Sequence, residues 1–198
     1  PDITYSFYPV YCQLNGITAE TVALNDDFSL DLDAIPDHAG AVIFPNPNAP
    51  TGQTVSLAAI SRLCRRLPDQ VIVVDEAYVD FGTETAVPLV QDHPNLLVVQ
   101  TFSKSRALAG LRVGLAIGQP ELLAGLERIK NSLKSDPVDR LASAGAIAAI
   151  KDRQGFAEDC QRIIDSRQWL TAQLTTLGFD VVPSQANFVF VRHPQHDA

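Results

Sequence analysis

The first two thirds of the chain alternate short apolar runs with segments of mixed polarity. Apolar residues recur every three or four positions at 57–67 and 121–130, which is the spacing of amphipathic helices. The predominantly apolar runs have the length of buried strands, and they occupy residues 41–44, 71–74, 96–100 and 112–118. Such strands, alternating with helices, predict a three-layer α/β fold in which a mostly parallel sheet has helices on both faces.

The last third of the chain has a different pattern. Helical periodicity predicts two long helices, at 137–152 and 156–178, with Gly178 ending the second. Two short strands are predicted after them, within residues 179–192. Helices followed by paired strands are typical of an α+β arrangement.

A polar cluster with a proline, KSDP at 134–137, separates these two patterns and marks a candidate domain boundary. We expect a large domain at residues 1–135 and an incomplete small α+β domain at residues 136–198. The chain begins at Pro1 without a methionine and stops shortly after a strand pattern, so we also expect it to be part of a longer protein.

Composition narrows the classes of partner. The formal net charge is −8, which argues against binding to nucleic acid or to an anionic membrane surface, because both need clustered Lys and Arg. No apolar run approaches the length of a membrane span. Cys12, Cys64 and Cys160 are widely spaced and show no metal-ligand pattern. We therefore expect no metal site, and reduced thiols in a cytoplasmic protein.

The residues that follow three predicted strands carry the candidate chemistry. In open α/β sheets, ligands bind beyond the carboxyl ends of the strands. The first of these strands is followed by the turn PNPNAPTG at 45–52, the second by Asp75 and Tyr78, and the third by Ser103 and Lys104. Taken singly, an aspartate placed like Asp75 is more often a helix cap, and a lysine placed like Lys104 is more often a solvated surface residue. Together these residues would meet at one rim.

This combination of side chains matches the needs of pyridoxal 5′-phosphate. The cofactor requires a lysine for its Schiff base and an acidic partner for its pyridine nitrogen, which Lys104 and Asp75 can supply. Tyr78 lies three residues after Asp75 and can reach the ring oxygen of the cofactor. The phosphate would be bound by hydroxyl and guanidinium groups, those of Thr101, Ser103 and Arg112. Lys104, once released from the cofactor, would act as the base that moves a substrate proton.

Three motifs in this order, PNPNAPTG, VVDEAYVDF and TFSKSRALAGLRVG, resemble the fold-type I PLP-dependent aminotransferases. Within that family the chain is most similar to the histidinol-phosphate aminotransferases, through DEAYVDF, KSRALAGLR and DRLA. The resemblance implies transfer of an amino group between histidinol phosphate and 2-oxoglutarate or glutamate, in histidine biosynthesis, by a homodimer. It also gives Tyr5 of TYSFY the role of stacking on the cofactor ring, and it implies a PLP-transferase large domain.

One position departs from the pattern of this family. The turn usually carries an asparagine that binds the ring oxygen of the cofactor, and Ala49 stands there in this chain. Asn48 or a water molecule is the candidate substitute, with Tyr78 carrying more of the interaction. The family's substrate-binding arginine would come after Ala198. We therefore expect the fragment alone to be a poor catalyst or inactive.

Other functions remain open from the residues alone. The same cofactor residues would serve an aromatic amino-acid aminotransferase or a threonine-phosphate decarboxylase. A non-catalytic PLP-binding or structural fragment is the alternative from another class. A hydrophobic strand ending in Asp75-Glu76 also resembles the acidic strand of a P-loop nucleotidase, but the GxxxxGK[ST] loop is absent from this sequence.

Overall fold

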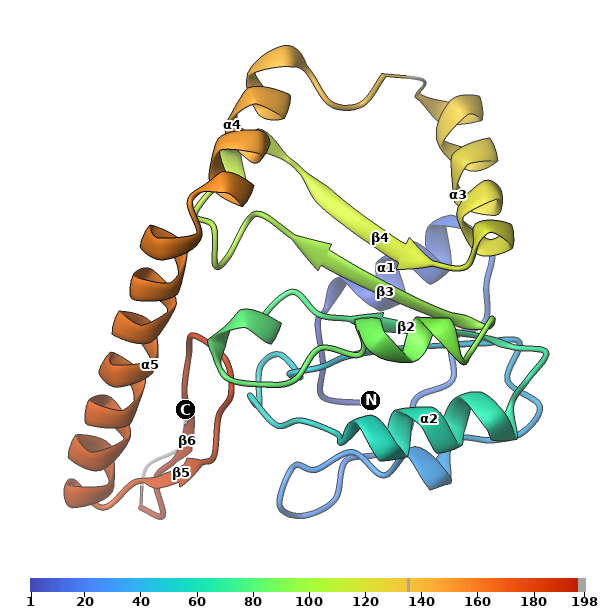
Figure 1. Cartoon of the computed structure of the whole chain (residues 1–198). Coiled ribbons are helices and arrows are strands. Elements are labelled where there is room, and N and C mark those ends of the chain that lie inside the picture. Colours follow the sequence, from blue (N-terminus) through green and yellow to red (C-terminus); the bar gives the residue numbers. More distant parts are fainter. Residues whose placement is uncertain (135, 196–198) are drawn as a thin grey trace.

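A computed structural model describes residues 1–134 and 136–195, and its main feature is a four-stranded sheet (Figure 1). Its strands are β1 (Ala41–Pro45), β2 (Val71–Asp75), β3 (Leu96–Thr101) and β4 (Gly114–Gly118), and they lie in the order β1-β2-β3-β4. The first three strands pair in parallel, and β4 runs antiparallel to β3. All four predicted strands are present, and the sheet is mostly parallel as expected.

One face of the sheet is covered by the amphipathic helix α2 (Leu57–Arg66). Its apolar side chains, Ile60 and Leu63 among them, share one buried cluster with Ile72 and Val74 of β2. The hydroxyl of Ser56 caps the helix by accepting a hydrogen bond from the backbone of Ala59 at 3.2 Å. The short helix η3 (Val87–Gln91) adds to the same layer through contacts with β3.

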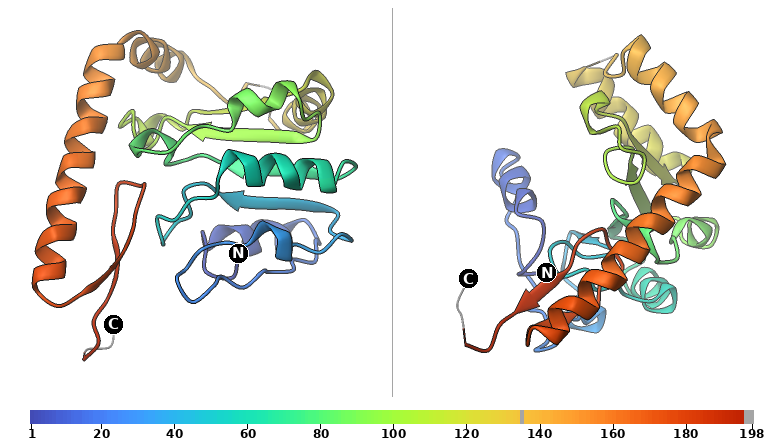
Figure 2. Two further views of the ribbon diagram at one scale, coloured as in Figure 1. Left: turned by 60° about the horizontal axis from the view of Figure 1, so that its bottom comes forward. Right: turned by 90° about the vertical axis from the view of Figure 1, so that its left-hand side faces the viewer.

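The opposite face of the sheet is only partly covered within the described residues. Alternate side chains of the strands point to this face, and Ile43 of β1 is 42% exposed there. Helix α1 (Phe7–Leu14) lies on this side and reaches the sheet through Tyr8 (Figure 2, right). Helical segments thus lie on both sides of the sheet, and the two sides differ in how completely they bury it.

Three further helices follow the sheet, α3 (Pro120–Leu133), α4 (Arg140–Lys151) and α5 (Arg153–Thr176). Helix α4 begins three residues later than periodicity predicts, because the carboxylate of Asp139 accepts a hydrogen bond from the backbone of Ala142 and caps it there. Helix α5 begins three residues earlier, behind Asp152, and Gly178 adopts a positive φ of 88° beyond its end. The strands β5 (Asp180–Val182) and β6 (Phe190–Arg192) form an antiparallel pair.

The expected domain boundary falls between α3 and α4, at a segment that includes Ser135, which lies outside the described residues. Helix α5 runs past the carboxyl ends of the parallel strands (Figure 2, left). The guanidinium of Arg167 on this helix donates hydrogen bonds to the carbonyl oxygens of Phe81, at 2.9 Å, and Ala186, at 2.6 Å. The C-terminal segment is therefore packed against the edge of the sheet where the strands end.

Gly52 allows the C-terminal segment to approach the turn after β1 closely. Its carbonyl accepts a hydrogen bond from the backbone of Gln185 at 2.9 Å, and its φ is +76°. A Cβ atom on this residue would collide with Ser184, both its side chain and its Cα. Glycine is required here because a side chain meets both steric overlap and an unfavourable backbone conformation.

We expect Gly52→Ala to lower the free energy of unfolding of the full-length protein by about 1–3 kcal/mol, measured by urea denaturation. Gly40→Ala is the matched control, since its Cβ would meet no atom within 4 Å and its φ is not positive. The control should leave stability unchanged within about 0.5 kcal/mol, or raise it slightly. Equal effects of the two substitutions would contradict this account of Gly52.

Candidate active site

The three strand ends singled out in the sequence meet at one edge of the sheet. Pro45 of β1 is in register with Asp75 of β2. Beyond that pair, the backbone of Asn46 donates to the carbonyl of Asp75 at 2.8 Å, and the backbone of Glu76 donates to the carbonyl of Val99 at 2.8 Å. The convergence predicted from parallel pairing is confirmed by this register.

Asp75 occupies the centre of this edge, and its carboxylate has two hydrogen-bond donors. Oδ1 accepts from the backbone of Ala77 at 3.1 Å, and Oδ2 accepts from the hydroxyl of Tyr8 at 2.7 Å. Sequence reasoning missed Tyr8. Its only sequence signal is its place three residues after Tyr5 in TYSFY.

The ring of Tyr5, which precedes the N-cap of α1, lies beside the ring of Tyr8 in the first turn of that helix. Their ring centroids are 5.5 Å apart with an interplanar angle of 82°, which is the edge-to-face arrangement that aromatic pairs favour. Burial raises the pKa of Tyr8, and the neighbouring Asp75, Tyr5 and Tyr78 raise it further. Tyr5 is 47% exposed, so a ligand can reach it for stacking.

Tyr78 and Lys104 form the other side of the site. The Nζ atom of Lys104 lies 5.2 Å from the centroid of the Tyr78 ring, within the range of a cation–π contact. The ring of Phe188, from the C-terminal segment, packs edge-on against Tyr78 with centroids 5.0 Å apart. Lys104 is exposed, so its amine is accessible to a ligand.

The predicted phosphate ligands are only partly brought together. The hydroxyl of Thr101 donates to that of Ser103 at 3.0 Å, and the backbone of Ser103 donates to the hydroxyl of Thr101 at 3.1 Å. Val113, which follows Arg112, pairs with the residue between Thr101 and Ser103, because the backbone of Phe102 donates to the carbonyl of Val113 at 3.1 Å. The exposed guanidinium of Arg112 donates to the carbonyl of Ala109 at 3.0 Å.

The side chain of Asn48 makes hydrogen bonds to other residues of the chain. Its side-chain amide donates to the carbonyl of Ile3 and to the hydroxyl of Thr51, both at 3.0 Å, and its oxygen accepts from the hydroxyl of Thr4 at 2.9 Å. The residue is 3% exposed. Both amide hydrogens are thus committed to tying the start of the chain to the turn, which competes with the expected contact between Asn48 and a cofactor. That contact stays a prediction.

Glu76 follows Asp75 but has a different role. Its buried carboxylate accepts hydrogen bonds from the hydroxyl of Thr85 at 2.6 Å, the backbone of Ala86 at 2.5 Å and the side chain of Gln100 at 2.8 Å. Burial raises the pKa of Glu76. The three donors satisfy a carboxyl group that would otherwise be costly to bury, so Glu76 holds the loop after β2 in place.

The sequence and fold of this chain match known proteins. Residues 1–198 match the family described as "Aminotransferase class I and II", and the chain belongs to this family. The fold class expected from the sequence is thereby confirmed. No cluster of three metal-ligating side chains occurs among the described residues, and no helix there is long and apolar enough to cross a bilayer.

Three relatives narrow the comparison. The chain is 58% identical over 198 residues to "Histidinol-phosphate aminotransferase 1" of Pseudomonas fluorescens, and 59% identical over the same length to the protein of that name from Pseudomonas aeruginosa. All of the chain aligns in both cases, but it spans only 57% and 56% of these relatives. A crystal structure of histidinol-phosphate aminotransferase from Sinorhizobium meliloti, in complex with pyridoxal-5′-phosphate, has 27% identity and a TM-score of 0.88. That alignment covers 97% of this chain and 54% of the other.

We expect Asn48→Ala to lower the free energy of unfolding of the full-length protein by about 1–3 kcal/mol, because three hydrogen bonds are lost at a buried position. Asn131→Ala, at an exposed position of α3, is the control and should change stability by no more than about 0.5 kcal/mol. Chemical denaturation of both variants without added cofactor makes the comparison. An unaltered midpoint for Asn48→Ala would show that these hydrogen bonds contribute little.

Proposed function

We propose that the protein containing this chain is a PLP-dependent aminotransferase that moves an amino group between histidinol phosphate and 2-oxoglutarate or glutamate. The observation that carries the proposal is the arrangement at the sheet edge. Asp75, at the end of β2, accepts a hydrogen bond from Tyr8, and Lys104, after the adjacent strand β3, lies over the ring of Tyr78. Relatives named histidinol-phosphate aminotransferase, 58% and 59% identical over the whole chain, support the substrate and a place in histidine biosynthesis.

The side chains at this edge fit the cofactor in kind. Lys104 presents an exposed amine, which suits covalent attachment to an aldehyde. The carboxylate of Asp75 has one protein donor on each oxygen, and a carboxylate has about four lone-pair sites, so it has capacity for a protonated ring nitrogen. The Sinorhizobium meliloti relative contains pyridoxal-5′-phosphate, which supports the same cofactor here.

Each residue then has a defined task. The bound cofactor supplies an electron sink for the negative charge that develops at the substrate Cα. Asp75 would accept a hydrogen bond from the ring nitrogen, Tyr78 would donate to the ring oxygen, and Tyr5 would stack on the ring. Thr101, Ser103 and Arg112 would bind the phosphate, which requires the Arg112 guanidinium to leave the carbonyl of Ala109. Lys104, in its uncharged form, takes the proton from the substrate Cα.

The remaining expectations about the whole protein belong to this proposal. A large domain at residues 1–135 and part of a small domain at 136–198 agree with the position of the sheet and of α4–β6. A homodimer would bury apolar side chains that are exposed in this chain, among them Phe7, Leu133 and Leu141.

The three free cysteines fit a cytoplasmic protein. Since the chain spans 57% of its relatives, we expect it to be inactive alone.

We expect Lys104→Ala in the full-length protein to abolish the visible absorption of lysine-linked cofactor and to lower kcat at least about a hundredfold. Lys130→Ala, on the exposed surface of α3, is the matched control and should retain both properties. Absorption spectra after cofactor addition, together with steady-state kinetics, provide the measurement. Persistence of the absorption band in Lys104→Ala would rule out the assigned role and favour a non-catalytic cofactor-binding protein.

With 2-oxoglutarate as acceptor, kcat/KM for histidinol phosphate should exceed that for phenylalanine by about tenfold or more, a difference of about 1.4 kcal/mol. The reverse order would identify an aromatic amino-acid aminotransferase. Release of CO2 from threonine phosphate, without amino transfer, would identify a decarboxylase instead. Amino transfer and decarboxylation use the same cofactor residues, so the side chains of the described site do not distinguish these functions. The comparison of the three substrates does.

A further inference from the structure

The hydrogen bond between Tyr8 and Asp75 joins two parts of the chain that are 67 residues apart. Tyr8 is on α1, whose side of the sheet is sparsely covered, and Asp75 is the last residue of β2. The bond is 2.7 Å long, and both of its partners are partly buried. A hydrogen bond to a charged acceptor at this depth is among the stronger ones in proteins.

We infer that Tyr8 is a positioning residue that orients the carboxylate of Asp75 toward the ring nitrogen of the cofactor. The inference rests on the proposed function, and it concerns a residue that the sequence motifs leave without a role. Tyr8 itself would not touch the reacting atoms. It acts through Asp75.

The geometry at Asp75 supports this role. The donor to Oδ1 comes from the backbone of Ala77, two residues along the chain, and the donor to Oδ2 comes from α1. Two donors of separate origin restrict rotation of the carboxylate about its Cβ–Cγ bond. A third donor can still be accepted at the remaining lone pairs. Without Tyr8, only the local backbone bond would orient the group.

The surroundings of Tyr8 keep it a donor. Burial and the nearby Asp75 both raise the pKa of the Tyr8 hydroxyl, so the phenol keeps its proton over the physiological range. The edge-to-face contact with Tyr5 restrains the Tyr8 ring from one side. Tyr5 and Tyr8 would then act on the same cofactor in different ways, the first by stacking on it and the second through Asp75.

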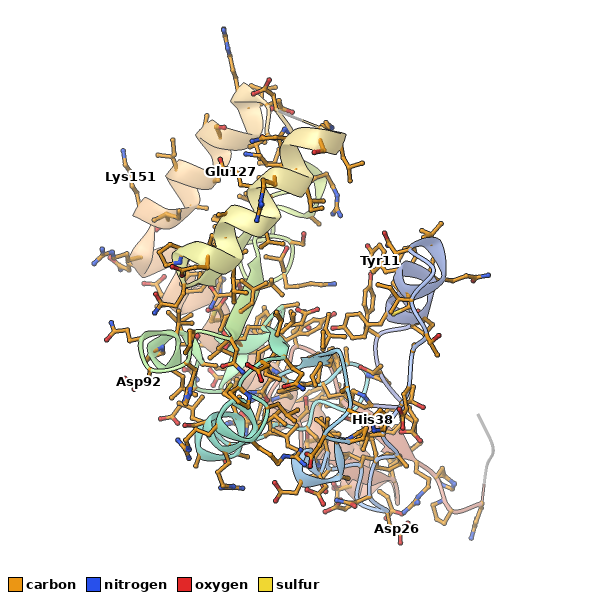
Figure 3. The ribbon with its side chains drawn as sticks, turned by 90° about the vertical axis from the view of Figure 1, so that its right-hand side faces the viewer. Tyr11, Asp26, His38, Asp92, Glu127 and Lys151 are labelled. Atoms are coloured by element: carbon orange, nitrogen blue, oxygen red, sulfur yellow. The ribbon has the colours of Figure 1, made fainter. Side chains whose placement is uncertain are left out.

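A purely structural role, in which Tyr8 only anchors α1, is the competing explanation. Helix α1 has other anchors nearby, since Asn48 binds both the carbonyl of Ile3 and the hydroxyl of Thr4. Removal of the Tyr8 hydroxyl should therefore leave the helix attached. Tyr11 offers a matched control, because it is on the same helix (labelled in Figure 3) and the residue is 53% exposed. Its hydroxyl makes no hydrogen bond among the described residues.

The test compares Tyr8→Phe and Tyr11→Phe in the full-length protein. Tyr8→Phe should raise the Kd for pyridoxal 5′-phosphate roughly three- to tenfold, measured by titration of the cofactor-free protein. The pH midpoint of the visible absorption should rise by about 0.3–1 unit, because a less well-oriented Asp75 would stabilise the positive charge at the ring nitrogen less, and the linked Lys104 nitrogen would then hold its own proton more tightly. Tyr11→Phe should change neither value, and thermal unfolding should show that both variants are folded.

A double-mutant cycle decides whether Tyr8 acts through Asp75. In an Asp75→Asn background, Tyr8→Phe should alter the Kd by less than about twofold, because the group it orients no longer carries the charge. Equal effects of Tyr8→Phe in both backgrounds, or an unshifted pH midpoint, would overturn the inference and leave Tyr8 as an anchor. If the unsubstituted protein binds no pyridoxal 5′-phosphate, the proposed function itself fails, and that outcome is distinct.

Discussion

The parallel pairing of β1, β2 and β3 is the constraint on which the rest of this structure depends. Parallel strands in register end at a common edge, so the turn after β1, the carboxylate at the end of β2 and the lysine after β3 become neighbours although about 30 residues separate each from the next. Burial of one sheet face beneath α2 stabilises that register, because a slip of one residue would turn Ile72 and Val74 away from the core.

Interactions around the sheet edge then convert neighbouring residues into a defined site. Asp75 is oriented by donors from its own backbone and from α1, while Glu76 is satisfied separately by the loop that follows. The C-terminal segment closes against the same edge through Arg167, and its Phe188 packs on Tyr78. The C-terminal segment also meets the turn after β1, where a Cβ atom on Gly52 would collide with Ser184.

The sequence predictions agree with the structure where a feature depends on residues close together in the chain. Strands and helices were predictable because apolar periodicity reflects local burial, and the convergence of the strand ends follows from the parallel sheet. The direction of β4 was not predictable, since an apolar run of this length carries no information about which way its strand runs. The ends of α4 depended on whether Asp139 or an earlier residue provides the cap, and periodicity does not decide this.

The sequence by itself determined the fold class, the candidate cofactor residues at the strand ends and the likeness to one family of aminotransferases. These properties depend on side-chain types at short spacings, which are visible in the chain. Only the tertiary structure decided which side chains bind one another across long separations. It paired Tyr8 with Asp75, committed Asn48 to residues 3 and 4, and turned Arg112 toward its own backbone. The physical reason is that a hydrogen bond depends on distance and direction in space, and packing sets both.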